Sequence, residues 1–272
     1  MKVYLDLVEE VLKNGTLKSN RTGTDTLMVF GAHYKINLSL GFPILTTKKV
    51  FFNSVIRELL WYLSGETHIR NLRQNTKIWD AWTSEEKNWE IGKMYGYQWV
   101  NWDKYKKNPI TGEIEHSHIN QIENAISLIK NNPNSRRIVV SAWNPSVLDE
   151  IALPSCHAFF MFNVLDGKLN CHLTQRSGDI ALGIPFNIAC YATLTQMIAQ
   201  ETGLELGEFS HYINDAHIYV NHIEGLKTQL KREPFDLPKL EIAKKSFWNL
   251  EFEDFKLLNY KHHPPIKFPV AV

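Results

Sequence analysis

The sequence has 272 residues, of which 44% are hydrophobic, so the chain can bury a large core without disulfides or a structural metal. Lys and Arg total 30 against 29 Asp and Glu, and the formal net charge of +1 excludes a general electrostatic affinity for nucleic acid or anionic membranes. The N-terminus does not resemble a signal peptide, and no stretch approaches the ~20 apolar residues of a membrane span. The 3 cysteines lack metal-ligand spacing, so we expect free thiols, a cytoplasmic protein and no bound metal.

The first half of the chain is predicted to hold three helices, one strand and one long loop. Apolar residues at helical spacing and glycine stops define the helices, and β-branched runs define the strand. The stretch over 83–117 is polar and rich in Lys, Asn, Gly and Trp, which indicates surface loop with short helices. The predicted elements, in order, are a helix over 4–12 ended by Gly15, a strand over 26–38, a helix over 53–64 ended by Gly65, and a helix over 119–129 closed by 131–133.

The second half is richer in strands. Three strand-like runs come first, and Asp166-Gly167 between the last two is a hairpin turn. The apolar tail to Val272 predicts docking, because free termini are usually polar. The mixed order predicts an α+β fold in one domain over 1–272, with a twisted mixed sheet packed by helices around a long central helix. The segments are strands over 137–143, 157–165 and 168–176, the central helix over 187–201, a strand over 210–219 and a helix over 220–231.

Three cysteines compete for the role of nucleophile. Cys171 alternates with apolar strand residues and Cys190 lies in the apolar central helix, so both are predicted to be core residues. Cys156, in Leu153-Pro154-Ser155-Cys156-His157, stands where a loop meets a strand, a place where reactive groups are exposed on rigid support. The alternative is an inert, partly buried thiol.

Four arginines in turn-like contexts suggest a phosphorylated substrate. Arg21, Arg136, Arg137 and Arg176 each lie beside Ser, Gly or Asn, and a guanidinium matches phosphate bidentately. No Walker or dinucleotide glycine pattern is present, so a phosphate would need a cage of convergent arginines. The alternative for each arginine is a solvated surface charge.

Other polar residues stand out by position. Glu58 interrupts an apolar helix, so its carboxylate is either paired or functional. Asn187 precedes the central helix and is either an N-cap or a ligand-reading amide. His217 and Tyr219 alternate along one strand and share a face, where they either bind a sugar hydroxyl or pack.

These residues fall into one ordered pattern, and the chain resembles the thymidylate synthase family from end to end. The matching segments are Asn20-Arg21-Thr22-Gly23-Thr24, Gly41-Phe42-Pro43, Thr46-Thr47-Lys48, Glu58-Leu59-Leu60-Trp61, Ile78-Trp79-Asp80, Tyr95-Gly96, Ser135-Arg136-Arg137, Ser141-Ala142-Trp143-Asn144, Cys156-His157-Ala158-Phe159, Gln175-Arg176-Ser177, Leu182-Gly183, Pro185-Phe186-Asn187-Ile188, Asp215 with His217 and Tyr219, and Ala271.

The resemblance implies reductive methylation of dUMP to dTMP, with 5,10-methylenetetrahydrofolate as the donor of carbon and hydride and dihydrofolate as the by-product. Cys156 adds to uracil C6 in this scheme, and its thiol pKa is expected to be depressed by the Arg176 guanidinium. Arg136 and Arg137 are expected to reach the partner's site in a homodimer formed through the sheet face.

The resemblance also implies a role for each matched residue. The catalytic residues are Cys156, Glu58, Arg176, Asn187, His157 and Tyr95. Substrate is bound by Arg21, Arg136, Arg137, Gln175, Ser177, Asn187, His217 and Tyr219. The folate is bound by Lys48, Ile78, Trp79, Trp82, Asp179, Leu182, Gly183, Phe186 and Ala271.

Five positions depart from the family pattern, and three other functions remain open. The departures are Phe51, Lys93, Ser155, Ile213 and Asn214, and they affect expected loop rigidity and folate affinity. The nearest alternative is a dUMP hydroxymethylase, in which water rather than hydride completes the reaction; Trp79 and the apolar tail favour the synthase. The others are a cysteine hydrolase, which leaves the arginines unexplained, and a nucleotide-binding protein without activity.

Overall fold

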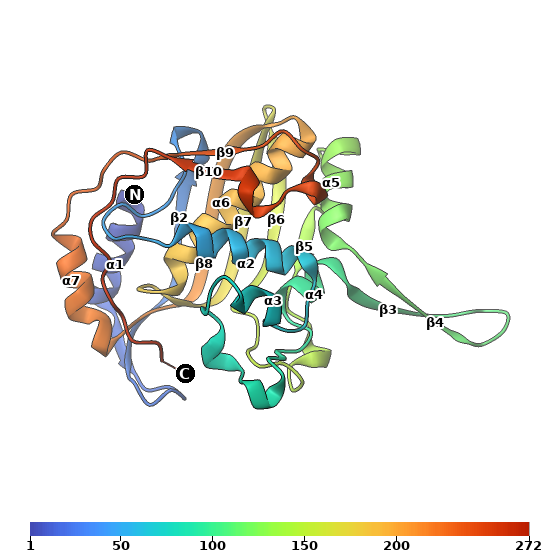
Figure 1. Ribbon diagram of the computed structural model, residues 1–272, viewed down its shortest axis with the longest axis horizontal. Coiled ribbons are helices and arrows are strands. Elements are labelled where there is room, and N and C mark those ends of the chain that lie inside the picture. The colour runs from blue at the N-terminus through green and yellow to red at the C-terminus, as the bar shows by residue number, and fades with distance from the viewer. Residues whose placement is uncertain (272) are drawn as a thin grey trace.

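The computed structural model describes residues 1–271 and has the mixed α and β content that the sequence predicts (Figure 1). No helix in this part of the chain is long and apolar enough to cross a membrane. Its helices are α1 (Lys2–Asn14), α2 (Phe52–Ser64), α3 (Arg70–Arg73), α4 (Tyr95–Val100), α5 (Gln121–Asn131), α6 (Gly183–Thr202) and α7 (Ile223–Leu230). Its strands are β1 (Thr16–Lys18), β2 (Thr26–Asn37), β3 (Trp102–Lys107), β4 (Ile114–Ile119), β5 (Val139–Ser141), β6 (His157–Leu165), β7 (Lys168–Asp179), β8 (Glu205–Tyr219), β9 (Lys239–Ile242) and β10 (Phe255–Leu258).

A six-stranded mixed sheet forms the centre, in the order β1-β2-β8-β7-β6-β5. All neighbours are antiparallel except β7 and β8, which run parallel and are joined by the crossover helix α6. The predicted hairpin between β6 and β7 is confirmed, since Asp166 and Gly167 both take positive φ, of 51° and 74°. The sheet thereby places the ends of β6, β7 and β8 side by side.

The two faces of the sheet differ in cover. Phe160, Leu173 and Phe209 are fully buried on the face that packs against α6, which confirms the predicted central helix. On the other face Met161 and Tyr212 are partly exposed, and no second layer covers them within residues 1–271. An uncovered sheet face with partly exposed apolar side chains suits a subunit interface. The homodimer through this face stays a prediction.

The surface loop with short helices predicted over 83–117 does contain the short helix α4, but the prediction is wrong in its last part, where β3 and β4 form a hairpin that projects from the body (Figure 1). Nearly all hairpin residues are exposed on both faces, so they carry none of the apolar alternation by which strands are recognised. Ile119 ends β4 and does not begin a helix; α5 starts at Gln121, with the Asn120 side chain accepting from Glu123 N.

The central helix begins earlier than predicted, at Gly183 rather than at Asn187. Pro185 lies in its first turn, where its missing N–H costs no intrahelical hydrogen bond. The N-cap interpretation of Asn187 is therefore wrong, because this residue lies inside the helix with its side chain free for other partners.

The C-terminal tail is docked, as predicted, although it has no regular structure after Leu258. His263 N donates to Thr46 O at 2.8 Å, and Pro269 O lies 2.7 Å from His222 Nε2. The Phe268 ring packs 5.0 Å from the His222 ring. Val272, the predicted apolar end, lies outside the described residues.

Candidate active site

Cys156 lies immediately before β6 and is partly buried, whereas Cys171 and Cys190 are buried in the core as predicted. Its backbone is held from two sides. Its N–H donates to Tyr95 Oη at 2.7 Å, and its carbonyl accepts from Arg176 N at 2.8 Å. Of the three thiols, only that of Cys156 is accessible and fixed at the edge of the sheet.

Tyr95 reaches Cys156 from a strained position at the start of α4. Its φ is 23°, outside the regions that non-glycine residues normally adopt. The next residue, Gly96, packs directly on the backbone of Tyr62 in α2, where an added Cβ would lie only 2.1 Å from the Tyr62 carbonyl oxygen. Contact between α2 and α4 thus fixes the strained tyrosine, and strain of this kind concentrates at functional sites.

The Arg176 guanidinium forms hydrogen bonds with the segment that precedes Cys156. Its Nε donates to Ser155 O at 3.0 Å, and its Nη2 donates to Pro154 O. Burial raises the pKa of the Cys156 thiol, while the charge of Arg176, a hydrogen bond with Tyr95 and the charge of Arg21 oppose that rise. The prediction of a depressed pKa is therefore wrong for the protein without ligands, because desolvation outweighs the nearby positive charge.

Gln175, the neighbour of Arg176 on β7, orients Asn187. Gln175 Nε2 donates to Asn187 Oδ1 at 3.1 Å and to Ser177 O at 2.9 Å, so the Asn187 amide nitrogen is left for another partner. Gln175 Oε1 lies 2.9 Å from His211 Nε2, and His211 Nδ1 lies 2.7 Å from Tyr34 Oη. His211 therefore donates from Nε2 and accepts at Nδ1, and burial lowers its pKa to about 3, which keeps it neutral.

Glu58 projects from α2 into the interior and accepts from Trp79 Nε1 at 2.7 Å. Burial raises its pKa to about 7, against the hydrogen bonds of Trp79 and Tyr62, so its carboxyl group exchanges a proton near neutral pH. His157 stacks on Tyr95 at 4.0 Å, and its Nδ1 lies 2.8 Å from Tyr191 Oη. Burial, with a smaller effect of Arg176, lowers the pKa of His157 to about 3, so this imidazole stays neutral.

A second polar group lies where β7 and β8 run in register, with Ser177 opposite Asp215. His217 Nδ1 is 2.9 Å from Asp215 Oδ1, and the His217 ring is 5.2 Å from the Tyr219 ring, so the predicted shared face is confirmed. Burial raises the pKa of Tyr219 and the charge of Arg21 opposes this, as it does at Cys156, so Arg21 lies within electrostatic reach of both.

Asp179, at the end of β7, holds the turn that follows the strand. Its Oδ1 accepts from Ala181 N at 2.9 Å and from Leu182 N at 3.2 Å, which leaves Oδ2 without a hydrogen bond within residues 1–271. Ile78, Trp82 and Phe186 are partly exposed and pack against the core, and the Trp82 ring lies 5.2 Å from that of buried Trp79. The folate contacts predicted for Asp179 and for these apolar side chains stay predictions.

Lys48 is buried and turned inward. Its Nζ donates to Ala181 O and lies 4.8 Å from the centre of the Phe268 ring, and burial lowers its pKa to about 8. In this conformation it ties the residues after Asp179 to the tail. Its predicted contact with the folate glutamate stays a prediction, as do the partly exposed Gly183 and Ala271.

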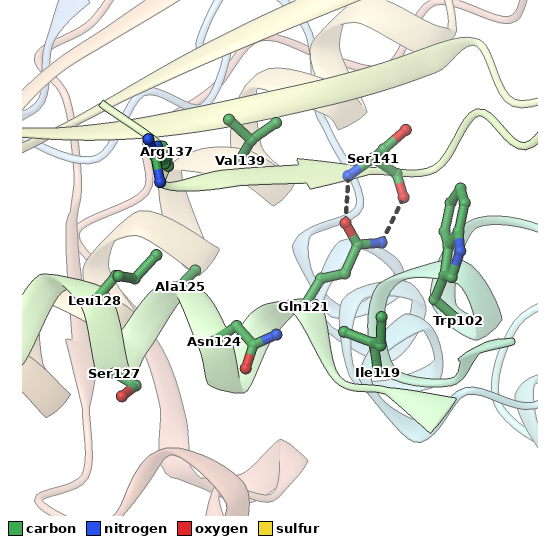
Figure 2. A pocket seen from close by; sticks show the side chains of 10 residues that line it. All are labelled: Trp102, Ile119, Gln121, Asn124, Ala125, Ser127, Leu128, Arg137, Val139 and Ser141. Carbon is green, nitrogen blue, oxygen red and sulfur yellow. Dashed lines mark hydrogen bonds between the residues drawn. The ribbon is translucent and has the colours of Figure 1, made fainter. Parts of the chain in front are cut away.

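Arg136 and Arg137 are not brought to Cys156. Both are exposed before β5, and neither side chain has a hydrogen-bond or ion-pair partner within residues 1–271. Figure 2 shows Arg137 and Val139 above α5, where they line a cavity of about 570 Å³. Gln121 and Ser141 also line it and are joined by two hydrogen bonds. No other predicted site residue lines this cavity, so it is separate from the thiol.

A family model described as thymidylate synthase matches residues 2–272. The chain belongs to the thymidylate synthase family. The match spans essentially the whole sequence and confirms the resemblance drawn from the motifs. At the level of the family, the activity is methylation of dUMP with methylenetetrahydrofolate as co-substrate.

The five departures from the thymidylate synthase pattern lie in different surroundings. Ile213 is fully buried against Gly178, and Ser155 is buried with its hydroxyl unpaired among the described residues. Lys93 forms an ion pair with Asp103 at 2.8 Å. Phe51 is 53% exposed beneath Lys49, and Asn214 is exposed.

His211, Tyr34 and Tyr191 were not predicted from the sequence, and they support site residues by hydrogen bonds: His211 contacts Gln175 and Tyr34, and Tyr191 contacts His157. Each is buried and carries a polar group, and only the hydrogen-bond requirement of such a group could have pointed to it.

Proposed function

We propose that this protein converts dUMP to dTMP, a reaction for which bound 5,10-methylenetetrahydrofolate supplies the carbon and the hydride and leaves as dihydrofolate. One observation carries the proposal. Adjacent residues of β7 hold the two groups that must meet the pyrimidine, since Arg176 fixes the segment of Cys156 and Gln175 fixes the Asn187 amide. A nucleophile and an amide positioned by one strand suit a heterocycle that is attacked at one edge and read at the other.

Cys156 acts as the nucleophile in this proposal. The sulfur lone pair forms a bond to uracil C6, and the C5–C6 π electrons move to C5 and O4 as an enolate. Because burial raises the thiol pKa, the thiolate must be favoured when substrate binds, and displacement of water around Arg176 strengthens the attraction between the two groups. Asn187 offers its amide nitrogen to the uracil edge, because Gln175 already occupies its oxygen.

Glu58 is the proton-exchanging group. A pKa of about 7 gives comparable amounts of acid and carboxylate near neutral pH, which suits transfer to and from the pyrimidine through water. His157 and Tyr95 have a different task. The imidazole stays neutral and the stacked pair positions the backbone of Cys156, so both support the nucleophile.

The phosphate site is composite. Arg21, Arg176 and Ser177 approach from the same chain, and we propose that Arg136 and Arg137 enter from the partner subunit of a homodimer. Their exposure and lack of partners within residues 1–271 support this assignment. His217 and Tyr219, which share a face of β8, hold the sugar 3′ hydroxyl.

The shared site is tested by mixing two inactive variants, Cys156→Ala and the double variant Arg136→Ala with Arg137→Ala. After subunit exchange, half of the dimers are mixed, and each contains one site with both an intact thiol and intact partner arginines. We expect about a quarter of the normal activity to return. Absence of any recovery in verified mixed dimers would show that the arginines act within their own chain.

Product analysis tests the reaction itself. The purified protein is incubated with dUMP and methylenetetrahydrofolate, and both nucleotide and folate are identified. We expect dTMP with dihydrofolate. Hydroxymethyl-dUMP with tetrahydrofolate would replace the proposal with the hydroxymethylase, and binding of dUMP without turnover would replace it with a nucleotide-binding protein.

A further inference from the structure

Three potential metal ligands converge on the projecting hairpin, outside the candidate active site. They are Asp103 on β3 and His116 and His118 on β4, and their ligand atoms all lie within 4.8 Å of one another. The two histidines are two residues apart, so they share one face of the strand, and Asp103 is the cross-strand partner of His118.

The three groups meet at one atom. Asp103 Oδ1 is 2.8 Å from His116 Nε2 and 3.4 Å from His118 Nε2. With ligand bonds of about 2.0–2.1 Å, a tetrahedral zinc site separates its ligand atoms by about 3.4 Å. The His118 contact already has this length, and the His116 contact reaches it by a small side-chain rotation on an exposed strand.

Neighbouring groups orient the carboxylate and leave the converging oxygen in place. Lys93 Nζ takes the opposite oxygen, Asp103 Oδ2, at 2.8 Å, while Tyr97 Oη makes a longer contact of 3.2 Å to Oδ1. An ionised carboxylate oxygen accepts from more than one direction, so Oδ1 can keep Tyr97 and bind a metal. The His116 ring is held by stacking on Tyr105, 4.6 Å between centroids. Partners of this kind fix the orientation of metal ligands.

We propose that Asp103, His116 and His118 bind a divalent first-row transition metal of the zinc class at the base of the hairpin. Two imidazoles with one carboxylate are a ligand set that such ions prefer, with a fourth position for water. The site is separate from Cys156. Because Asp103 lies on β3 and both histidines lie on β4, the metal links the two strands and limits their separation.

Zinc titration of tag-free, chelator-treated protein tests the site by calorimetry. A Cys156→Ser background removes the accessible thiol as a competing ligand. We expect one Zn²⁺ per chain, and we expect at least about 100-fold weaker binding when His116 and His118 are both changed to Ala, since even loss of an outer partner costs 10- to 100-fold. The His262→Gln variant, which alters a partly buried histidine in the C-terminal tail, is the matched control and keeps full affinity.

Equal stoichiometric binding by the double variant, or no saturable binding by the parent, would overturn the proposal. Two further measurements are independent of affinity. Co²⁺ in place of Zn²⁺ is expected to give the intense visible bands of a four-coordinate site, which the double variant lacks. Zn²⁺ is also expected to slow trypsin cleavage after Lys106 and Lys107 in the parent and not in the double variant; unchanged cleavage would refute the stabilising role.

Discussion

Glu58 gives the sharpest test of the electrostatics of the site, because its buried carboxyl group links folding to pH. The folded-state pKa of about 7 stands above the reference value of 4.5, and the difference corresponds to about 3 kcal/mol. Since the pKa is raised on folding, the folded state holds this proton more tightly than the unfolded chain. The contribution is fully present below about pH 4.5 and is lost as the pH rises through about 7.

The variant Glu58→Gln removes this dependence. Glutamine keeps an oxygen for Trp79 Nε1 but never ionises. Between about pH 5 and pH 8.5, the free energy of unfolding of the variant should therefore fall about 2.5 kcal/mol less than that of the parent. Urea unfolding at matched protein concentration measures the difference. His157 and His211 also titrate on unfolding, but they are common to both proteins and cancel.

The exposed glutamate Glu9 on α1 supplies the control, since Glu9→Gln removes a carboxylate without burial. Parallel pH curves for the parent and Glu58→Gln would refute the claim that burial raises the Glu58 pKa. A second readout concerns the proposed chemistry. Turnover by Glu58→Gln should fall by about 10²- to 10⁴-fold, as expected for loss of a proton-transferring group, while dUMP affinity changes little.

Three further outcomes follow from contacts around the site. Arg176→Met should slow alkylation of Cys156 by iodoacetamide about tenfold at pH 8, because the charge that opposes the rise in thiol pKa is removed; equal rates would contradict this. Gln175→Leu should lower the free energy of unfolding by about 1–3 kcal/mol in urea, because the Asn187 oxygen and His211 Nε2 lose their partner; an unchanged value would show that these hydrogen bonds add no net stability. His222→Phe removes the hydrogen bond to Pro269 O and should speed proteolysis of the tail; unchanged cleavage would show that apolar contacts alone hold it.

The elements that were predicted correctly are those whose own residues show a clear apolar pattern or a characteristic turn. α2 shows a continuous apolar face and ends at Gly65, which takes the left-handed conformation with φ of 70°. The hairpin of β6 and β7 was found from Asp166-Gly167 alone. In both cases neighbouring residues decide the structure, so a local pattern suffices.

The supporting network around Asn187 could not be predicted in this way. Gln175, His211 and Tyr34 meet only because β7, β8 and β2 lie side by side, with Tyr34 opposite His211 in the register of β2 and β8. These residues are distant in sequence, and a one-residue slip of register would move their side chains to the other face. Partner choice therefore depends on the assembled sheet.

The hairpin of β3 and β4 was not predicted, because its own residues carry no local strand pattern. Its strands are polar on both faces, so the alternation that marks a half-buried strand is absent, although cross-strand pairing fixes them in space. The pair His116 and His118 carried a visible spacing of two residues, but it pointed to a metal site only once a strand placed both on one face and pairing supplied Asp103.

The pKa of the Cys156 thiol could not be predicted from the identity of its neighbours alone. Arg176 was identified from the sequence and does lower the thiol pKa, but desolvation raises it by more. The effect of a guanidinium on a pKa comes from one residue that can be named from the sequence, whereas burial sums over every group that displaces water around the sulfur. The thiol pKa also depends on what else Arg176 contacts. Its Nε and Nη2 donate to backbone carbonyls, and a bound anion would further reduce the effect of its charge on the sulfur. A raised thiol pKa keeps Cys156 mostly protonated near neutral pH and so protects it from oxidation, because oxidation follows thiolate character; in the proposed reaction, substrate binding would then have to favour the thiolate.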